Sequence, residues 1–439
     1  SRGLGDVYKR QIIDTRFSYS EVTMAVISSK NMYDILRKSF SILNPQLMHH
    51  SERTAYILYK MLLAEGRMNN QEMADYVLIA LLHDIGTCKL EYIDHWAEYE
   101  KNDVWPHSIY GFLFLKYLSP LESKAEVVLY HHLDYNKHYV IKSQYIKIAE
   151  YLFMADKMDV VMSMPGTLES DYLQKYRNIK FSAEALALFL KANAQYKVLD
   201  NLKHDDYLKE LDELIASVNF SEEYKRKFLQ MLVYIIDFRS EHTVIHTLAT
   251  TIFAQELGEM MHLTAQEKYN LYYGALLHDI GKIAIPLSIL EAPGRLTPKE
   301  MDIMKKHVEI TDHILTGIVD DDVREIAIRH HEKIDGSGYF RGLKGEQLTK
   351  PQRIVAVADI ISALYGKRSY KEAFDIDKIK EIIKSDADNN KICPQVVGVA
   401  LRNMNRIIDN FEKKKEVTLG TYMQIKRQEH EIYEQFKGL

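Results

Sequence analysis

The segment ALLHDIG occurs twice in this chain of 439 residues, at residues 80–86 and again at residues 275–281. Each copy places a histidine directly before an aspartate, and imidazole and carboxylate groups are ligands for Zn, Mn and Fe. Adjacent residues of a regular helix point about 100° apart, so both side chains reach one centre only near a helix end. Gly86 and Gly281 follow two residues after the aspartates and are consistent with such an end.

Each copy belongs to a longer series with the order His, His-Asp, His, His-His, Asp. The first series is His50, His83, Asp84, His107, His131, His132 and Asp156. The second series is His246, His278, Asp279, His307, His330, His331 and Asp359. The first interval is 33 positions in one series and 32 in the other, and the interval before the His-His pair is 24 and 23. Matched intervals over this length indicate a duplicated domain.

The number of ligands favours a pair of metal ions. One open catalytic ion needs three or four protein ligands, so seven are too many for it. Seven suit two ions about 3.5–4 Å apart that share a bridging carboxylate. Such a pair activates a water and stabilises the attacking and leaving oxygens at phosphorus. A single His-Asp dipeptide does not by itself predict a metal site. Seven residues in the same order, occurring twice, predict metal binding in both copies.

Helices are expected to position these residues. Apolar residues recur at three- and four-residue spacing, and Gly 19 and Pro 9 are low counts for this length. Thr264 with Glu267 predicts a helix that begins just before the second His-Asp pair. Thr297-Pro298 with Glu300 predicts the start of another. The predicted fold class is all-α, with two tandem helical domains joined by a helical connection.

The pattern divides the chain into four parts. Residues 1–20 are expected to be a disordered or non-native leader, because they fit no periodic pattern. The two metal-binding domains are expected at 21–205 and 206–410. Residues 411–439 are expected to form a charged helical tail that is solvated or contacts a second copy, which is compatible with a homodimer.

Composition excludes several classes. A net charge of −5 gives no sign of a nucleic-acid binder, so DNA is not an expected partner. There is no run of about 18 apolar residues and hence no membrane span. No signal peptide is visible. The two cysteines exclude a disulfide framework and fit the reducing cytoplasm.

The ordered series resembles the HD superfamily of metal-dependent phosphohydrolases. The second copy is more specific, because ALLHDIGKIAIP (275–286) and HHEKIDGSGYF (330–340) resemble the HD-GYP subfamily over about residues 235–375. That resemblance implies an all-helical fold and a site of two or three metals, often iron or manganese. It also implies hydrolysis of cyclic di-GMP or another cyclic dinucleotide. The first copy resembles only the general superfamily, and Thr87 stands where the second copy has Lys282.

The resemblance also implies roles for single residues. The metal ligands are the seven residues of the second series, with Asp279 shared between ions and catalytic. The implied substrate-binding residues are Lys282, Arg368, Lys371, Gly338 and Tyr339, with Lys282 also catalytic. Three departures stand out: Phe340 replaces Pro in the name motif, Ser362 replaces a second Asp, and His242 stands where a third-metal Glu is expected. The departures favour two ions over three.

The resulting prediction is a phosphodiesterase that converts a cyclic dinucleotide, cyclic di-GMP first, to the linear dinucleotide in its C-terminal domain. Two divalent ions are expected there, with Fe or Mn favoured and Zn, Mg or Ni compatible, and metal is also expected in the N-terminal domain. Two alternatives stay open. One is hydrolysis of another nucleotide or phosphate ester, and the other is a non-catalytic module that senses metal or nucleotide.

Overall fold

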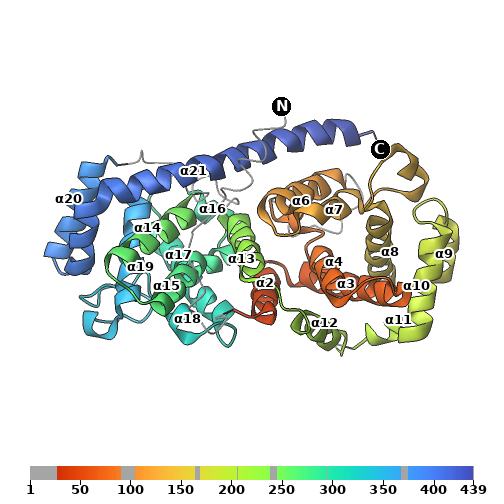
Figure 1. The fold of residues 1–439 in the computed structure, drawn as a ribbon, viewed down its shortest axis with the longest axis horizontal. Coiled ribbons are helices and arrows are strands. Elements are labelled where there is room, and N and C mark those ends of the chain that lie inside the picture. The colour runs from red at the N-terminus through yellow and green to blue at the C-terminus, as the bar shows by residue number, and fades with distance from the viewer. Residues whose placement is uncertain are drawn as a thin grey trace. The chain divides into compact units, whose positions relative to one another are not determined.

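The computed structural model describes residues 27–89, 104–163, 169–204, 206–237, 245–292, 294–366 and 374–438. Within these ranges the regular elements are helices, two isolated bridge pairs occur and no strand forms, which confirms the all-α prediction (Figure 1). Both expected capping boxes are present, since Thr264 pairs with Glu267 and Thr297 with Glu300. Each cap satisfies backbone N–H groups that the first helical turn leaves without partners.

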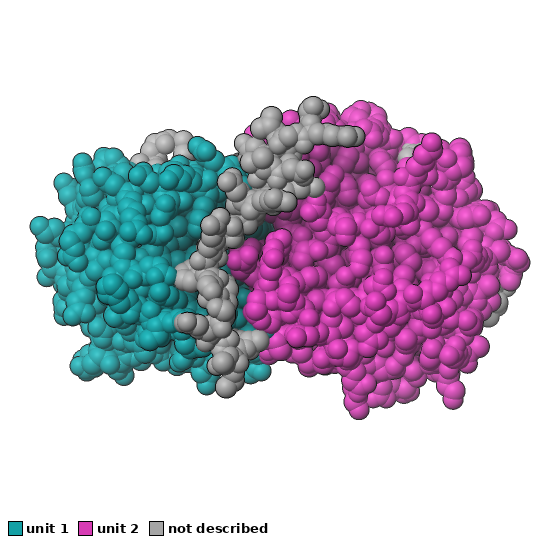
Figure 2. Space-filling model, in the orientation of Figure 1, with its two compact units in different colours: residues 1–27, 232–422 teal, residues 28–231, 423–439 magenta. Residues whose placement is uncertain are grey.

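The chain forms two compact units, coloured separately in Figure 2. The N-terminal unit comprises Ser28–Met231 with Met423–Leu439, and the C-terminal unit comprises Leu232–Tyr422. This division differs from the boundary expected between residues 205 and 206. The reason is that Glu210 accepts a hydrogen bond from Tyr56 at 2.9 Å, and Asp212 accepts one from Arg37 at 3.3 Å. The expected leader, residues 1–20, lies outside the described residues.

The bounds of the elements are as follows. The N-terminal unit contains α2 (Ser29–Leu43), α3 (Pro45–Glu65), α4 (Asn70–Leu81), η2 (Ile85–Lys89), α6 (Trp105–Leu118), η4 (Glu122–Lys124), α7 (Glu126–Tyr130), η5 (Tyr135–Val140), α8 (Ile146–Ser163), α9 (Glu169–Tyr176), α10 (Ala183–Tyr196), α11 (Val198–Asn201) and α12 (Asp206–Ala216). Helix α13 (Glu222–Asp237) crosses the division. The C-terminal unit contains α14 (His246–Met260), α15 (Ala265–Leu277), η6 (Ile280–Ala284), α16 (Leu287–Leu290), α17 (Pro298–Leu315), α18 (Asp321–Ile328), η7 (Gly345–Gln347), α19 (Lys350–Tyr365), α20 (Ile376–Asp388) and most of α21 (Pro394–Phe436).

The duplication is visible as a repeated set of packed elements. In the N-terminal unit α3 packs on α4 and α8, α6 packs on η2 and α7, and α7 packs on α8. In the C-terminal unit α14 packs on α15 and α19, α17 packs on η6 and α18, and α18 packs on α19. The two sets correspond element by element in chain order. Each matched pair of intervals in the sequence therefore reflects one shared arrangement of helices.

The tail is part of the packed fold. The core of the C-terminal unit joins α14, α19 and α21 through residues such as Phe253, Val357 and Phe411. Further along α21, Gln428 accepts a hydrogen bond from Tyr117 at 2.8 Å, and the Phe436 ring lies 4.7 Å from that of Trp105. The tail expected for residues 411–439 is helical within α21, and its contact with a second copy stays a prediction. Among the described helices, none is both long and apolar enough to cross a membrane.

Candidate metal centres and active site

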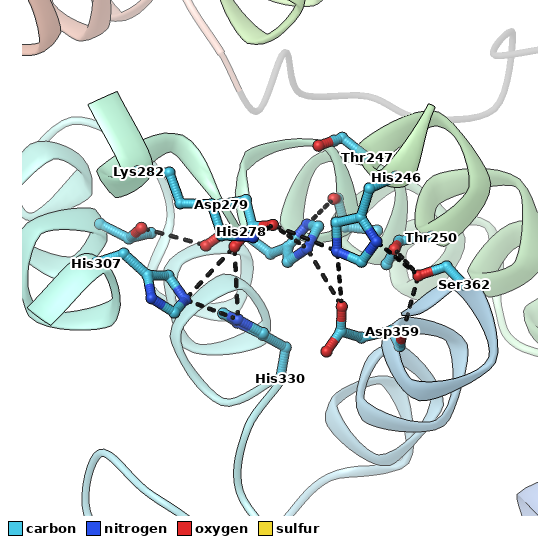
Figure 3. A network of polar contacts seen from close by, with 12 residues as sticks. His246, Thr247, Thr250, His278, Asp279, Lys282, His307, His330, Asp359 and Ser362 are labelled. Atoms are coloured by element: carbon cyan, nitrogen blue, oxygen red, sulfur yellow. Dashed lines mark hydrogen bonds and ion pairs between the residues drawn. The ribbon is translucent and has the colours of Figure 1, made fainter. Parts of the chain in front are cut away.

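The seven ligand candidates of the C-terminal unit meet at one place, and all of them except His331 are labelled in Figure 3. They lie at the start of α14 (His246), between α15 and η6 (His278 and Asp279), on α17 (His307), after α18 (His330 and His331) and on α19 (Asp359). The His-Asp pair and the His-His pair both follow helix ends. Adjacent residues can turn toward one centre there, as expected from helical geometry.

Asp279 lies between two groups of histidines. Its Oδ2 atom lies 3.4 Å from His246 Nε2 and 3.2 Å from His278 Nε2. Its Oδ1 atom lies 3.4 Å from His307 Nε2 and 3.9 Å from His330 Nε2. One carboxylate therefore presents a different oxygen to each group. This is the arrangement that a carboxylate shared by two ions requires.

Asp359 closes the ring of ligands from the opposite helix. Its Oδ1 atom lies 3.0 Å from His246 Nε2 and 3.6 Å from His278 Nε2. Its Oδ2 atom lies 3.7 Å from His331 Nδ1. The two aspartates together contact all five histidines, so the whole series predicted from the sequence converges.

The glycine of the repeated motif has a packing role. A Cβ atom at Gly281 would lie 2.0 Å from the His307 carbonyl oxygen, and one at Gly86 would lie 2.0 Å from that of His107. Neither glycine has a positive φ, so conformational freedom is not the reason for it. Each glycine lets η6 or η2 touch the backbone of the helix that carries the third histidine. This close approach, rather than the helix end expected from the sequence, sets the distance between the His-Asp pair and that histidine.

Backbone carbonyls orient several of the imidazoles. The Nδ1 atoms of His278, His307 and His330 lie 2.6–2.7 Å from the carbonyl oxygens three residues earlier. An Nδ1–H that donates to a carbonyl leaves the Nε2 lone pair directed into the centre. The ring orientation is therefore fixed by the helix to which each histidine belongs.

Burial and the two aspartates shift the pKa values of the histidines in opposite directions. It lowers the pKa of His307 to about 4 and the pKa of His331 to about 3. Burial also lowers the pKa of His278, but Asp279 and Asp359 outweigh it and raise that pKa to about 10. Burial raises the pKa of Asp279, yet His278 and Lys282 hold it well below its usual range. His307, His331 and Asp279 are thus in the neutral imidazole and ionised carboxylate forms that coordinate metals, whereas His278 must release a proton when it binds one.

These residues fit a pair of divalent cations. The ligand atoms of His246, His278 and Asp279 lie within 4.8 Å of one another, and so do those of His307, His330 and His331. Buried His278 Nε2 and Asp279 Oδ1 make no hydrogen bond within the described parts of the chain. Buried polar atoms left in this way are costly, and a bound cation would satisfy them. Nitrogen and carboxylate donors suit Fe, Mn or Zn.

A cavity of about 480 Å³ opens beside this centre. Its lining includes His246, His307, His331, Lys282 and Tyr339, and apolar side chains such as Met304 and Phe411 form much of the rest. The volume falls in the range of small-molecule sites. The Lys282 ammonium lies 2.5 Å from Asp279 Oδ2, beside the ligands. Arg368 and Lys371, the other two predicted phosphate contacts, lie outside the described residues.

The GSGY loop is pinned against the His-His segment. A Cβ atom at Gly338 would lie 2.4 Å from the backbone nitrogen of Lys333, and the Tyr339 ring lies 4.6 Å from that of His331. Buried Glu332 accepts backbone hydrogen bonds from two loop residues at 2.6 and 2.9 Å. Phe340, in the Pro position of the name motif, is 40% exposed. The loop is therefore held by Glu332 and not by residue 340. No motif in the sequence marks Glu332 for this role.

Ser362, the second departure, lies behind a ligand. Its hydroxyl donates to the Asp359 carbonyl at 2.8 Å and lies 3.1 Å from His246 Nδ1. Thr250 contacts the same hydroxyl at 2.7 Å (Figure 3). Ser362 thus supports His246 from its far side. The third departure, His242, lies outside the described residues.

The N-terminal series converges in the same way. Asp84 Oδ2 lies 3.3 Å from His83 Nε2, and Asp84 Oδ1 lies 3.5 Å from His107 Nε2. The remaining members complete two groups of ligand atoms within 4.8 Å, namely His50, His83 and Asp156, and Asp84, His107, His131 and His132. The Thr87 hydroxyl donates to the Asp84 carbonyl at 2.7 Å, so it offers the centre no cation where the other unit has Lys282.

Comparison with known proteins assigns this arrangement to a class. The HD domain family matches the chain twice, over residues 47–160 and 230–396. The chain is 25% identical over 377 residues to the 3′3′-cGAMP-specific phosphodiesterase 1 of Vibrio cholerae, covering 81% of this chain and 87% of that relative. It is 30% identical over 272 residues to a cyclic di-GMP phosphodiesterase of Thermotoga maritima, covering 60% of this chain and 72% of that relative.

A solved structure shares the fold. The crystal structure of the cyclic GMP-AMP specific phosphodiesterase V-cGAP3 of V. cholerae aligns with a TM-score of 0.54 at 19% identity, over 86% of this chain and 98% of that one. Tandem helical domains with paired His/Asp centres define a metal-dependent hydrolase. The chain belongs to the HD-domain family of metal-dependent phosphohydrolases, as its sequence motifs indicated.

Proposed function

We propose that the C-terminal unit hydrolyses a cyclic dinucleotide, cyclic di-GMP first, to the linear dinucleotide. One observation carries the proposal: Asp279 presents one oxygen to each of two histidine groups beside a cavity of about 480 Å³. The named activities of the relatives, cyclic di-GMP and 3′3′-cGAMP phosphodiesterases, support the same substrate class. A single monophosphate would leave most of the cavity's apolar wall unused.

The protein's part in the reaction is to hold and orient. The seven ligands would hold the two divalent cations, and the Nδ1 contacts of His278, His307 and His330 keep these three imidazoles aimed inward. When bound, such a pair supplies an activated water and a Lewis acid at phosphorus. The net change is that a water oxygen replaces the ribose 3′ oxygen on phosphorus, and the 3′ oxygen leaves with a proton from that water.

Lys282 and Tyr339 are placed to bind the substrate. Lys282 lines the cavity beside Asp279, where its ammonium neutralises a phosphate oxygen as negative charge develops. Tyr339 presents an aromatic ring in the same lining. Such a ring stacks on a nucleobase, which favours a nucleotide ester over a simple phosphate ester. Arg368 and Lys371 remain predicted phosphate contacts on the strength of the resemblance alone.

The second candidate substrate is 3′3′-cGAMP. The relative named for it covers most of both chains, whereas the Thermotoga relative matches 60% of this chain. The two substrates differ in one base, so the choice between them depends on the cavity wall and not on the metal centre. Both are cleaved by the same displacement at phosphorus.

The test is turnover of both dinucleotides by the purified full chain loaded with Mn²⁺ or Fe²⁺. The expected result is a linear product from cyclic di-GMP, with a kcat/KM at least as high as for 3′3′-cGAMP. A higher value for 3′3′-cGAMP selects the second candidate. Metal-loaded protein that cleaves neither, yet binds one of them, would favour a sensing module over an enzyme of this substrate class.

A further inference from the structure

The two centres have ligands of the same types in the same order. They differ in the pair of residues that lies behind the first histidine. Three residues after that histidine the N-terminal unit has Arg53, and three residues after the last aspartate it has Asp159. The C-terminal unit has Ala249 and Ser362 at these positions. Arg53 Nη2 donates to Asp159 Oδ2 at 2.9 Å, and Arg53 Nε also contacts this carboxylate. A charged pair in one unit is thus replaced by two small residues in the other.

The difference changes the space beside the centre. Ala249 and Ser362 line the cavity of about 480 Å³ in the C-terminal unit. Among the described residues, a cavity that includes the ligand Asp84 in its lining has a volume of about 10 Å³, which holds about one water. The ligand side chains of the N-terminal centre are also more deeply buried than those of the C-terminal centre. His246 and His331 are 15% and 28% exposed, whereas the most exposed of the seven N-terminal ligands, Asp84, is 11% exposed.

The N-terminal centre also carries its cation in a different place. Lys157 Nζ lies 3.2 Å from Asp156 Oδ2, directly against a ligand carboxylate. Lys282 of the other unit also contacts a ligand carboxylate, at 2.5 Å from Asp279 Oδ2, but in addition it lines the large cavity. The deeper burial of the N-terminal ligands therefore argues against substrate binding in that unit.

The support of the first histidine differs in strength. His50 Nδ1 lies 2.8 Å from Asp159 Oδ2, whereas His246 Nδ1 lies 3.1 Å from the Ser362 hydroxyl. A carboxylate that accepts from the outer nitrogen makes the imidazole a stronger metal donor and fixes its orientation. Arg53 in turn holds the carboxylate. A hydroxyl that already donates to the Asp359 carbonyl gives weaker, neutral support.

We infer that the N-terminal His/Asp cluster is a closed structural metal centre that holds its ions more tightly than the C-terminal centre and takes no substrate. Asp159 is its positioning residue, acting through His50. The C-terminal centre gives up this support and gains an open cavity. The duplicated domain thereby divides into one site that stabilises the fold and one site that is accessible to a ligand.

The experiment uses two reciprocal variants of the full chain, both loaded with Mn²⁺. His278→Ala with Asp279→Ala leaves the N-terminal centre, and His83→Ala with Asp84→Ala leaves the C-terminal centre. Bound metal is measured after equilibration with increasing EDTA, and the melting temperature is recorded alongside. The N-terminal centre is expected to need about 10- to 100-fold more chelator for half-removal, the usual size of an outer carboxylate effect. Equal retention by the two variants would overturn the inference.

Matched substitutions test whether Asp159 acts on metal retention by supporting His50 or only by keeping the unit folded. In the first background Asp159→Ser is expected to bring chelator resistance down to the level of the C-terminal centre, and Asp159→Asn to lower it as well. In the second background Ser362→Asp is expected to raise the chelator resistance of the C-terminal centre. This tests the effect of an outer carboxylate without changing Asp159. No change from either substitution contradicts the role of Asp159.

A separate assay tests whether the N-terminal centre is closed to substrates. The His278→Ala, Asp279→Ala variant is incubated with bis-p-nitrophenyl phosphate, a small diester that needs little room. No release of nitrophenol is expected while the metal content of that variant persists. Turnover in this variant would show that the N-terminal centre is open and catalytic. This outcome is distinct from a failure of the cyclic-dinucleotide assignment, which concerns the other centre.

Discussion

At the scale of single residues, the central feature is one carboxylate with two separate tasks. Asp279 Oδ2 faces His278 and Asp279 Oδ1 faces His307, and Lys282 contacts the same group. A neutral amide of the same shape keeps the contacts of one oxygen but cannot serve two cations. The residues around Asp279 thus provide direct tests of metal sharing and of phosphate binding.

The first prediction concerns Asp279→Asn in the full chain. We expect it to abolish turnover of the cyclic dinucleotide and to remove most of the metal from the C-terminal centre. The reason is that an amide has one oxygen acceptor where the carboxylate has two. Metal analysis should be carried out in the His83→Ala, Asp84→Ala background, so that only one centre is counted. Full metal occupancy there would refute the shared-carboxylate arrangement.

The second prediction is that Lys282→Ala leaves the metal content intact and lowers kcat/KM about 10²- to 10³-fold, the usual effect of losing one contact to a developing oxyanion. The control is Lys378→Ala, since Lys378 pairs with the exposed Glu381 at 2.8 Å, and it should leave kcat/KM unchanged. If Lys282→Ala instead strips metal without a specific effect on kcat/KM, the lysine serves only as a partner of Asp279.

The third prediction concerns Gly281→Ala. A Cβ atom there would lie 2.0 Å from the His307 carbonyl oxygen, so η6 must move away from α17. We expect a loss of unfolding free energy of at least about 1–3 kcal/mol together with a loss of metal. The control is Gly420→Ala in α21, where an added Cβ atom has no neighbour within 4 Å apart from the backbone of its own helix. It should raise the free energy of unfolding by up to about 1 kcal/mol. Urea denaturation compares the two, and an unchanged midpoint for Gly281→Ala would contradict the packing role.

At the scale of elements, a repeated set of helix pairs places the ligands, and much of this was predictable. The order and spacing of fourteen histidines and aspartates indicated two equivalent centres, because matched intervals require matched helices. The capping boxes at Thr264 and Thr297 were also predictable, since they are local. The tight contact of η6 with α17 was not, because it depends on which carbonyl faces Gly281 in three dimensions.

The fourth prediction concerns the loop that Glu332 holds. Its buried carboxylate accepts backbone hydrogen bonds from Arg341 and Leu343 at 2.6 and 2.9 Å. Glu332→Ala is expected to free the loop and to raise KM more than it lowers kcat, because the metal ligands stay in place. Phe340→Ala is the control and should leave kcat/KM unchanged, since that side chain is exposed. An effect on kcat alone would place Glu332 in the metal centre's support instead.

At the scale of the whole molecule, the sequence predicted two units but not their extents. The predicted boundary puts residues 206–231 in the C-terminal domain, whereas in the structure they belong to the N-terminal unit. Their partners, such as Tyr56 for Glu210, lie far away in the sequence and could not be read from local periodicity. The end of α21 belongs to the N-terminal unit for the same reason. Long-range contacts of polar side chains carry no periodic signal.

The last prediction concerns the division of labour between the units. Both carry seven converging ligands, but the C-terminal unit has the large cavity and Lys282. Metal alone activates water and does not orient a diester, so cyclic-dinucleotide turnover should depend on that unit. His278→Ala with Asp279→Ala should abolish turnover, whereas His83→Ala with Asp84→Ala should leave it largely standing with a lower melting temperature. The reverse pattern, in variants shown by circular dichroism to be folded, would place the active site in the N-terminal unit.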